Sequence, residues 1–71
     1  MKTTNDELIT NRIREAINYS DKSKSTIAKE IMVSSPTLSQ YLSGRIMPSL
    51  STFKKLCESL DCSADDLLDI K

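Results

Sequence analysis

Residues 23–44 read SKSTIAKEIMVSSPTLSQYLSG, and this stretch predicts two short helices joined by a tight turn. Ser23 is a good N-capping residue, because its hydroxyl can accept a hydrogen bond from a free N–H of the first turn. The helix that follows is predicted to continue to about Ile31. Its apolar residues Ile27 and Ala28 recur with helical spacing and therefore face the interior.

The second helix of this pair begins at Ser34 or Ser35. Pro36 fits its first turn, where a missing N–H has no consequence. A proline also disfavours helical angles at the residue before it, which favours Ser35 as the capping residue. Gly44 ends the helix in the left-handed conformation that glycine adopts readily.

At about 100° per residue, this second helix has two unlike sides. One side carries the larger side chains Leu38, Tyr41 and Leu42. The other side carries small uncharged groups, namely Ser35, Pro36, Ser39, Gln40 and Ser43. Hydroxyl and amide groups suit a surface that exchanges hydrogen bonds with another polar surface. A helix with such a side fits the major groove of DNA.

Three further helices are predicted around this pair from their start signals. Thr4 with Glu7 forms a capping box, Ser49 caps a fourth helix, and Ser63 with Asp66 opens a short last one. Each of the three helices carries an apolar stripe at helical spacing. The inward residues are Leu8 or Ile9, Ile13, Ala16, Ile17, Phe53, Leu56, Cys57, Leu60, Leu67 and Leu68.

Length and composition favour a small helical protein. A chain of 71 residues holds one domain with one small core, here residues 1–71. Aromatic residues make up 4% of it, so Leu, Ile, Met and Ala must fill the core, which suits a helical bundle. We therefore predict an all-α, compact five-helix domain with its helix-turn-helix at about residues 24–43. No apolar run approaches the ~20 residues of a membrane span, and no signal peptide opens the chain, so we expect a cytoplasmic protein without membrane contact.

The formal net charge is zero, but the charges are unevenly distributed. Residues 22–55 carry six basic residues against Glu30 alone, a net of +5. Residues 1–21 have a net charge of −1, and residues 56–71 have one of −4. The positive block coincides with the helix pair and indicates an electrostatic footprint on one face. The alternative is that these charges only solvate the surface.

The sequence offers little for catalysis or metal binding. It has no histidine and two cysteines, which predicts no zinc site. Cys57 and Cys62 are five positions apart, too far for a bridge along one straight helix, so we expect free thiols in the core. Asp65 and Asp66 are explained by the preference for negative charge at a helix start. We predict no enzyme activity, no cofactor, no metal and no small-molecule substrate.

The order of these residues resembles the Cro/CI-type (XRE) helix-turn-helix family. The resemblance rests on SKSTIA at 23–28, VS at 33–34, LSQYLSG at 38–44 and PSL at 48–50, and it spans roughly residues 13–68. It implies a lambda-repressor-like DNA-binding domain that recognises a double-stranded DNA operator as a homodimer. The implied function is that of a transcriptional regulator, a phage- or prophage-type repressor.

The sequence departs from the family pattern in two ways. Met32, which forms the turn with Val33, stands where relatives usually have glycine. A left-handed methionine would cost about 1 kcal/mol, so we expect a reshaped turn instead. Ile17 and Leu42 stand where many relatives have an ion-paired arginine and glutamate. Replacing a whole buried pair by hydrocarbon is commonly neutral or stabilising, so we expect the fold to be kept.

The resemblance also implies site residues. Those in base-contacting positions are Ser35, Pro36, Thr37 and Gln40. Those expected at phosphates are Lys24, Ser34, Ser39, Ser43, Arg45 and Lys22. The Gln40 amide can pair with adenine N6 and N7. Because no arginine stands on the base-facing side, specificity is expected to depend also on DNA shape and on a second half-site.

Two questions stay open at this level. The same fold can serve as a protein-interaction module, such as an antitoxin or a regulatory subunit, with the acidic C-terminal segment as the contact. Salt-dependent retention on duplex DNA separates the two functions. Leu50, Leu68 and Ile70 are either dimer contacts or core residues at a frayed end.

Overall fold

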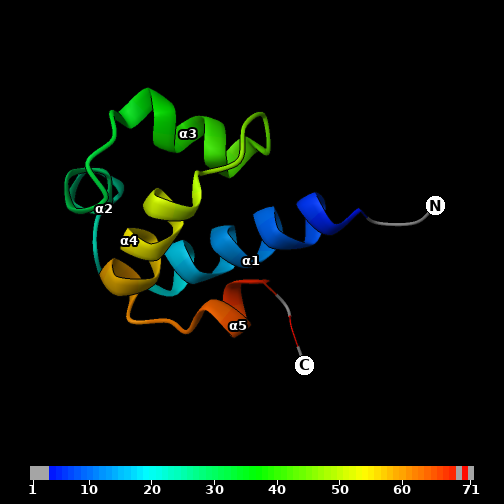
Figure 1. Cartoon of the computed structure of the whole chain (residues 1–71). Helices are drawn as coiled ribbons and strands as arrows, with labels where there is room; N and C mark the ends of the chain where they lie inside the picture. The colour runs from blue at the N-terminus through cyan, green and yellow to red at the C-terminus, as the bar shows by residue number, and fades with distance from the viewer. Residues whose placement is uncertain (1–3, 69, 71) are drawn as a thin grey trace.

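The computed structural model describes residues 4–68 and residue 70, and it shows five α-helices and no strand in that part of the chain (Figure 1). The helices are α1 (Asn5–Tyr19), α2 (Lys24–Glu30), α3 (Ser35–Ser43), α4 (Leu50–Leu60) and α5 (Ala64–Leu68). The predicted all-α, five-helix fold is therefore confirmed. Three of the charged residues counted above, Lys2, Asp69 and Lys71, lie outside the described residues.

Serine and threonine side chains begin every helix. In each case the hydroxyl oxygen accepts a hydrogen bond from the N–H three residues later, which satisfies a donor that the helix itself cannot pair. The bonds run from Glu7 to Thr4 (3.1 Å), Thr26 to Ser23 (3.1 Å), Thr37 to Ser34 (3.2 Å), Thr52 to Ser49 (3.2 Å) and Asp66 to Ser63 (3.2 Å). The predicted start signals of α1, α2, α4 and α5 are confirmed.

At α3 the preference for Ser35 as the cap is wrong. Ser34 has the extended backbone of a cap, with ψ at 159°, and Ser35 is the first helical residue. The Ser34 hydroxyl bonds both the N–H of Thr37 and, at 2.8 Å, the Thr37 hydroxyl. These two bonds outweigh the restriction that Pro36 places on the residue before it.

The core lies where the apolar stripes of the helices meet. Its buried members are Ile13, Ile17, Ile27, Ala28, Ile31, Leu38, Tyr41, Phe53, Leu56 and Leu67. Ile9, not Leu8, packs against this core from the first half of α1. Ile17 is buried and Leu42 partly buried, so both apolar replacements of the family's ion pair belong to the core region. Within the described residues, no helix is both long and apolar enough to cross a membrane.

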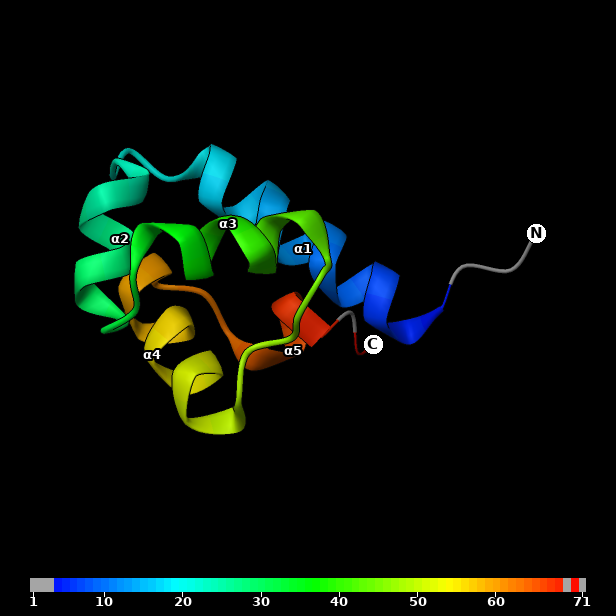
Figure 2. The same cartoon turned by 90° about the horizontal axis from the view of Figure 1, so that it is seen from above.

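The helices are arranged so that α3 and α5 lie at opposite ends of the molecule (Figure 1). α3 packs against α1 and α2, whereas α5 packs against α1 and α4. Seen from above, α3 lies in front of α1, with nothing between it and the viewer (Figure 2). This arrangement leaves one side of α3 uncovered and places the acidic α5 far from it.

α2, α3 and α4 end in the same way, with one left-handed residue. Met32, Gly44 and Asp61 have φ values of 65°, 79° and 53°. After α2, the N–H groups of Met32 and Val33 bond the carbonyls of Lys29 (3.2 Å) and Ala28 (2.9 Å), which is the Schellman pattern. Gly44 as the C-cap of α3 is thus confirmed.

The expected reshaped turn at Met32 is wrong, because the methionine takes the left-handed conformation itself. Two backbone hydrogen bonds and the packing of Val33 against the core hold it there. The Met32 side chain is 75% exposed, so nothing in the interior has to accommodate it. The turn therefore keeps its shape and carries the backbone strain.

The two cysteines do not lie on one straight helix, so the separation expected from helical rise does not apply to them. Cys57 lies in the last turns of α4, and Cys62 lies beyond the helix end at Asp61. Both thiols are free, as expected, but each is only partly buried.

Candidate nucleic-acid interface

The outward side of α3 is a continuous uncharged surface. Ser35, Pro36, Ser39 and Ser43 are exposed, and they recur at one side of the helix. Thr37 and Gln40 are partly buried and, at 100° per residue, lie next to each other along one edge of it, while Leu38 and Tyr41 are buried on the opposite side. We call the six residues from Ser35 to Ser43 on this side and at this edge the α3 face: Ser35, Pro36, Thr37, Ser39, Gln40 and Ser43.

Gln40 is the largest hydrogen-bonding side chain of the α3 face. Its backbone carbonyl accepts bonds from the Arg45 N–H (3.0 Å) and the Ser43 hydroxyl (3.1 Å), which fix the helix end. No described residue bonds its side-chain amide, and α5 packs on other helices. The amide therefore keeps its donor and acceptor for an external partner.

The hydroxyls of this region divide into two groups. Those of Ser34 and Thr37 bond each other in the cap, and that of Ser43 donates to the Gln40 carbonyl. Those of Ser35 and Ser39 have no partner among the described residues. Ser35 and Ser39 are thus the two serines on this face whose hydroxyls are uncommitted.

Two of the expected phosphate-binding cations are exposed beside α3. Lys24 is the first residue of α2, the helix packed against α3, and Arg45 directly follows the cap of α3. At Lys24 the side-chain charge lies next to the N–H groups of a helix start, and both favour an anion.

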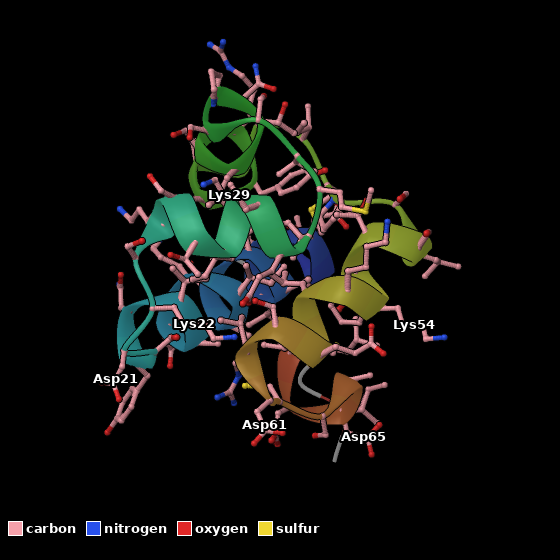
Figure 3. All side chains as sticks on the ribbon, turned by 90° about the vertical axis from the view of Figure 1, so that its left-hand side faces the viewer. Asp21, Lys22, Lys29, Lys54, Asp61 and Asp65 are labelled. Carbon is pink, nitrogen blue, oxygen red and sulfur yellow. The ribbon has the colours of Figure 1, made fainter. Side chains whose placement is uncertain are left out.

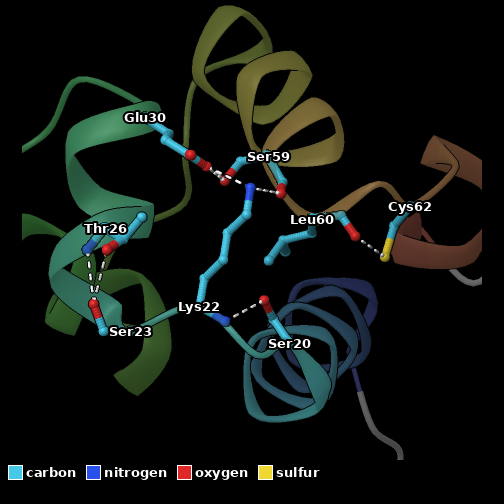
Figure 4. Close-up of polar contacts among 8 residues, drawn as sticks. All are labelled: Ser20, Lys22, Ser23, Thr26, Glu30, Ser59, Leu60 and Cys62. Carbon is cyan, nitrogen blue, oxygen red and sulfur yellow. Dashed lines mark hydrogen bonds and ion pairs between the residues drawn. The ribbon is translucent and has the colours of Figure 1, made fainter.

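Lys22 is used inside the molecule instead. Its Nζ donates to Glu30 Oε1 at 2.7 Å and to the Ser59 carbonyl at 2.6 Å, and the Ser59 hydroxyl donates to the same Glu30 oxygen at 2.6 Å (Figure 4). The hydrogen bond from Lys22, followed by that from Ser59, lowers the pKa of Glu30 below its ordinary value of 4.5. The structure directs this ammonium toward the end of α4 and not toward α3.

The charges separate in space as well as in sequence. Lys29 lies beside α3, while Asp61 and Asp65 lie at the opposite end of the molecule (Figure 3). Two carboxylates nevertheless lie close to α3: Asp6 and Glu7 line a hollow between α1 and the end of α3, together with Ser43 and Gly44. An anion at Ser43 would meet these carboxylates, but Arg14 lines the same hollow with the opposite charge.

Sequence reasoning missed the role of Arg14. Its guanidinium donates from Nε (3.1 Å) and Nη2 (2.7 Å) to the Leu42 carbonyl, and Nη1 lies 3.5 Å from Asn11 Oδ1. A cation at the C-terminal end of a helix also complements the helix dipole. Arg14 therefore fixes the end of α3 to α1. In the sequence, its position next to the inward-facing Ile13 is the feature that could have indicated this role.

Thr10 contributes to the same junction. It is buried on α1, and its methyl carbon would lie 3.5 Å from a Cβ added at Gly44. Its hydroxyl lies 3.7 Å from the sulfur of Met47 in the loop after α3. Of the three residues expected to be either dimer contacts or core, Leu50 and Ile70 are exposed and Leu68 is partly buried against the core.

The described residues form no cluster suited to a metal ion. Across residues 4–68 and 70, no three histidine, cysteine or acidic side chains gather as metal ligands would. The exposed groups on α3 are thus suited to hydrogen bonding and not to coordination.

A capped helix-turn-helix with an exposed polar second helix defines a class of DNA-binding regulators. A family model described as "Helix-turn-helix" matches residues 12–67. The chain belongs to this Cro/CI-type helix-turn-helix family.

A solved structure shows the same fold. The solution structure of the SOS-response transcriptional repressor LexA from Eubacterium rectale superposes with a TM-score of 0.83 at 24% identity. The similarity covers 96% of this chain and 72% of that one. A search of curated proteins gives no match.

Proposed function

We propose that this chain, as one domain over residues 1–71, binds double-stranded DNA sequence-specifically and acts as a repressor of the phage or prophage type. The single observation that carries the proposal is the α3 face, which is uncharged, uncovered and remote from the acidic end. The family supports it, and the fold shared with a protein named as a transcriptional repressor supports the repressor role. A cytoplasmic location follows from this function.

In the proposed complex, α3 lies in the major groove. Gln40 pairs with adenine N6 and N7, a contact worth ~1–3 kcal/mol of discrimination. The uncommitted hydroxyl of Ser35 reaches base edges, while the ring of Pro36 and the methyl group of Thr37 contact thymine methyls. The hydroxyl of Thr37 stays in the cap.

The phosphate backbone is held on both sides of this helix. Lys24 and Arg45 supply the charges, and Ser34, Ser39 and Ser43 supply backbone or hydroxyl donors. We leave Lys22 out, because its ammonium is bound to Glu30. A homodimer on half-sites about one helical turn apart, ~34 Å, would supply the affinity that one small domain lacks.

Selection of bound sequences from a random duplex pool tests the proposal directly. We expect an enriched pair of half-sites, with retention that falls steeply as salt rises. Gln40→Ala should relax the preference at one base pair of each half-site, whereas Asn18→Ala on α1 serves as the control and should change nothing. Recovery of random sequence, or retention that salt does not alter, would refute DNA recognition and favour the protein-interaction function.

A further inference from the structure

The end of α4 brings the two cysteines of the chain together. Asp61 is left-handed, and the N–H of Cys62 donates to the carbonyl of Cys57 at 3.0 Å. The neighbouring bond from the Asp61 N–H to the Glu58 carbonyl, 3.3 Å, completes a Schellman motif. In this motif the side chains of the two residues joined by the longer-range bond commonly contact each other, and here both are cysteines.

The backbone bond limits how far apart the two residues can be. With standard bond lengths, a 3.0 Å hydrogen bond between them keeps their Cα atoms within roughly 7 Å, and real bond angles shorten this further. Disulfides span Cα separations of about 4.4–6.8 Å. The folded backbone therefore keeps the Cα atoms of Cys57 and Cys62 close to the range that a disulfide spans.

The surroundings of the two thiols differ. Cys62 lines a hollow of about 410 Å³ between α1 and α5, which a small oxidant can enter. Its thiol makes one weak hydrogen bond, to the Leu60 carbonyl at 3.4 Å (Figure 4). A rotation about the Cα–Cβ bond of Cys62 would break only this weak contact.

Cys57 is placed to react with Cys62 once Cys62 has been oxidised. Burial, followed by the neighbouring Cys62, raises the pKa of the Cys57 thiol, so little of it is thiolate at neutral pH. It packs against the core and cannot move away from Cys62 without disturbing α4. An oxidised Cys62 therefore has a thiol beside it before any change of fold.

We propose that Cys57 and Cys62 form a reversible disulfide site that responds to hydroperoxides. The Cys62 sulfur attacks one peroxide oxygen and breaks the O–O bond, which leaves a sulfenic acid on Cys62 and, from hydrogen peroxide, releases water. The Cys57 sulfur then loses its proton to water and displaces hydroxide from the Cys62 sulfur. Two thiols and one hydrogen peroxide give one disulfide and two water molecules, and a dithiol reductant reverses the change.

Because Asp61 lies at the end of the molecule opposite α3, the site is independent of the α3 face (Figure 3). We therefore expect DNA affinity, where present, to change less than about threefold on oxidation, while the oxidised chain resists urea unfolding more strongly. Failure of DNA binding would leave this expectation about the thiols untouched.

The test treats the reduced full chain with hydrogen peroxide, blocks remaining thiols and measures intact mass. We expect a monomer that has lost two hydrogens. Cleavage after Glu58 or Asp61 should then give peptides that remain joined until reduced. Cys57→Ser should stop at a dimedone-reactive sulfenic acid on Cys62, whereas Cys62→Ser should react more slowly.

A second measurement uses the parent chain alone, so it does not depend on whether the cysteine variants fold. Equilibration with a glutathione buffer gives the effective concentration of the thiol pair, which we expect to be at least about tenfold higher in the folded chain than in urea. Sulfinic acid without a disulfide, disulfide-linked dimers alone, or an equal effective concentration in urea would each overturn the proposal.

Discussion

The two ends of this molecule contrast in charge and in how their side chains are used. At the α3 end, the polar side chains of Gln40, Ser35 and Ser39 have no hydrogen-bond partner among the described residues. Near the end of α4, Lys22, Glu30 and Ser59 bond one another, and acidic side chains dominate the surface beyond. A net charge of zero thus conceals a recognition surface, because it is the sum of two unlike regions. Polar groups left without internal partners indicate function better than the total charge.

The largest effect should come from removing the cations beside α3. Lys24→Ala combined with Arg45→Ala should lower affinity for the selected duplex about 100-fold, or ~2.7 kcal/mol, at ~0.1 M salt. The slope of log affinity against log salt should also become shallower by about two. Fluorescence anisotropy over a salt series measures both.

The control is a double variant that changes the net charge by the same amount away from the α3 face. Asn18→Asp combined with Ala64→Glu also lowers the net charge by two, at exposed positions on α1 and α5. We expect less than about a threefold loss, since salt screens charges that are added away from the α3 face. Equal losses for both double variants would show that only total charge matters, which removes the distinction between the ends.

Arg14→Met tests what fixes α3 in place. The variant keeps much of the hydrocarbon stem but loses both hydrogen bonds to the Leu42 carbonyl. Bonds from a charged donor contribute ~1.5–3 kcal/mol when shielded, and exposure lowers the expected loss to about 1–1.5 kcal/mol. Urea unfolding measures it, with Asn11→Ala, expected within about 0.5 kcal/mol of the parent, as the control. A loss no larger than that of the control would mean that the guanidinium is replaced by water without cost.

Local features of this fold could be predicted from the sequence, whereas contacts between distant helices could not. Caps and apolar stripes are local signals, and they located all five helices and the buried residues of α2, Ile27 and Ala28. The α3 face followed from the same periodicity. Arg14 could not be found this way, because its partner is a backbone carbonyl that only the packing of α1 against α3 brings near.

Two turns differ from the expectation for the same physical reason. Local preference disfavours a left-handed methionine at residue 32, and a straight-helix rule separates Cys57 from Cys62. In both places the chain ends a helix with a Schellman motif, whose hydrogen bonds and core contacts decide the backbone. Propensity is outweighed where several bonds depend on one residue's conformation.

Glycine substitutions at Met32 and Asp61 allow the backbone strain of the two turns to be compared through the free energy of unfolding. Met32→Gly should raise the free energy of unfolding by about 0.5–1 kcal/mol, because it removes left-handed strain and the greater freedom of unfolded glycine offsets part of the gain. Asp61→Gly should gain less than half as much, since aspartate tolerates this conformation better than methionine. Thermal and urea unfolding of both variants measure the difference. A loss of stability in Met32→Gly would show that the exposed side chain contributes contacts that outweigh the strain.

The smallest expected effect concerns the pH dependence of the Lys22–Glu30–Ser59 cluster. The folded pKa of Glu30 is lowered from 4.5, so the unfolded chain binds the proton more tightly. The stabilisation is therefore complete above about pH 4.5 and is lost as pH falls through the lower, folded pKa. The stability difference between the parent and Glu30→Gln should shrink over that window. Lys22→Met should reduce this pH-dependent stability difference more than Ser59→Ala does, because the Lys22 bond is the larger cause.

In DNA binding, Lys22→Met should leave the slope of log affinity against log salt unchanged. A slope shallower by about one would move Lys22 from the internal cluster to the phosphate-binding surface.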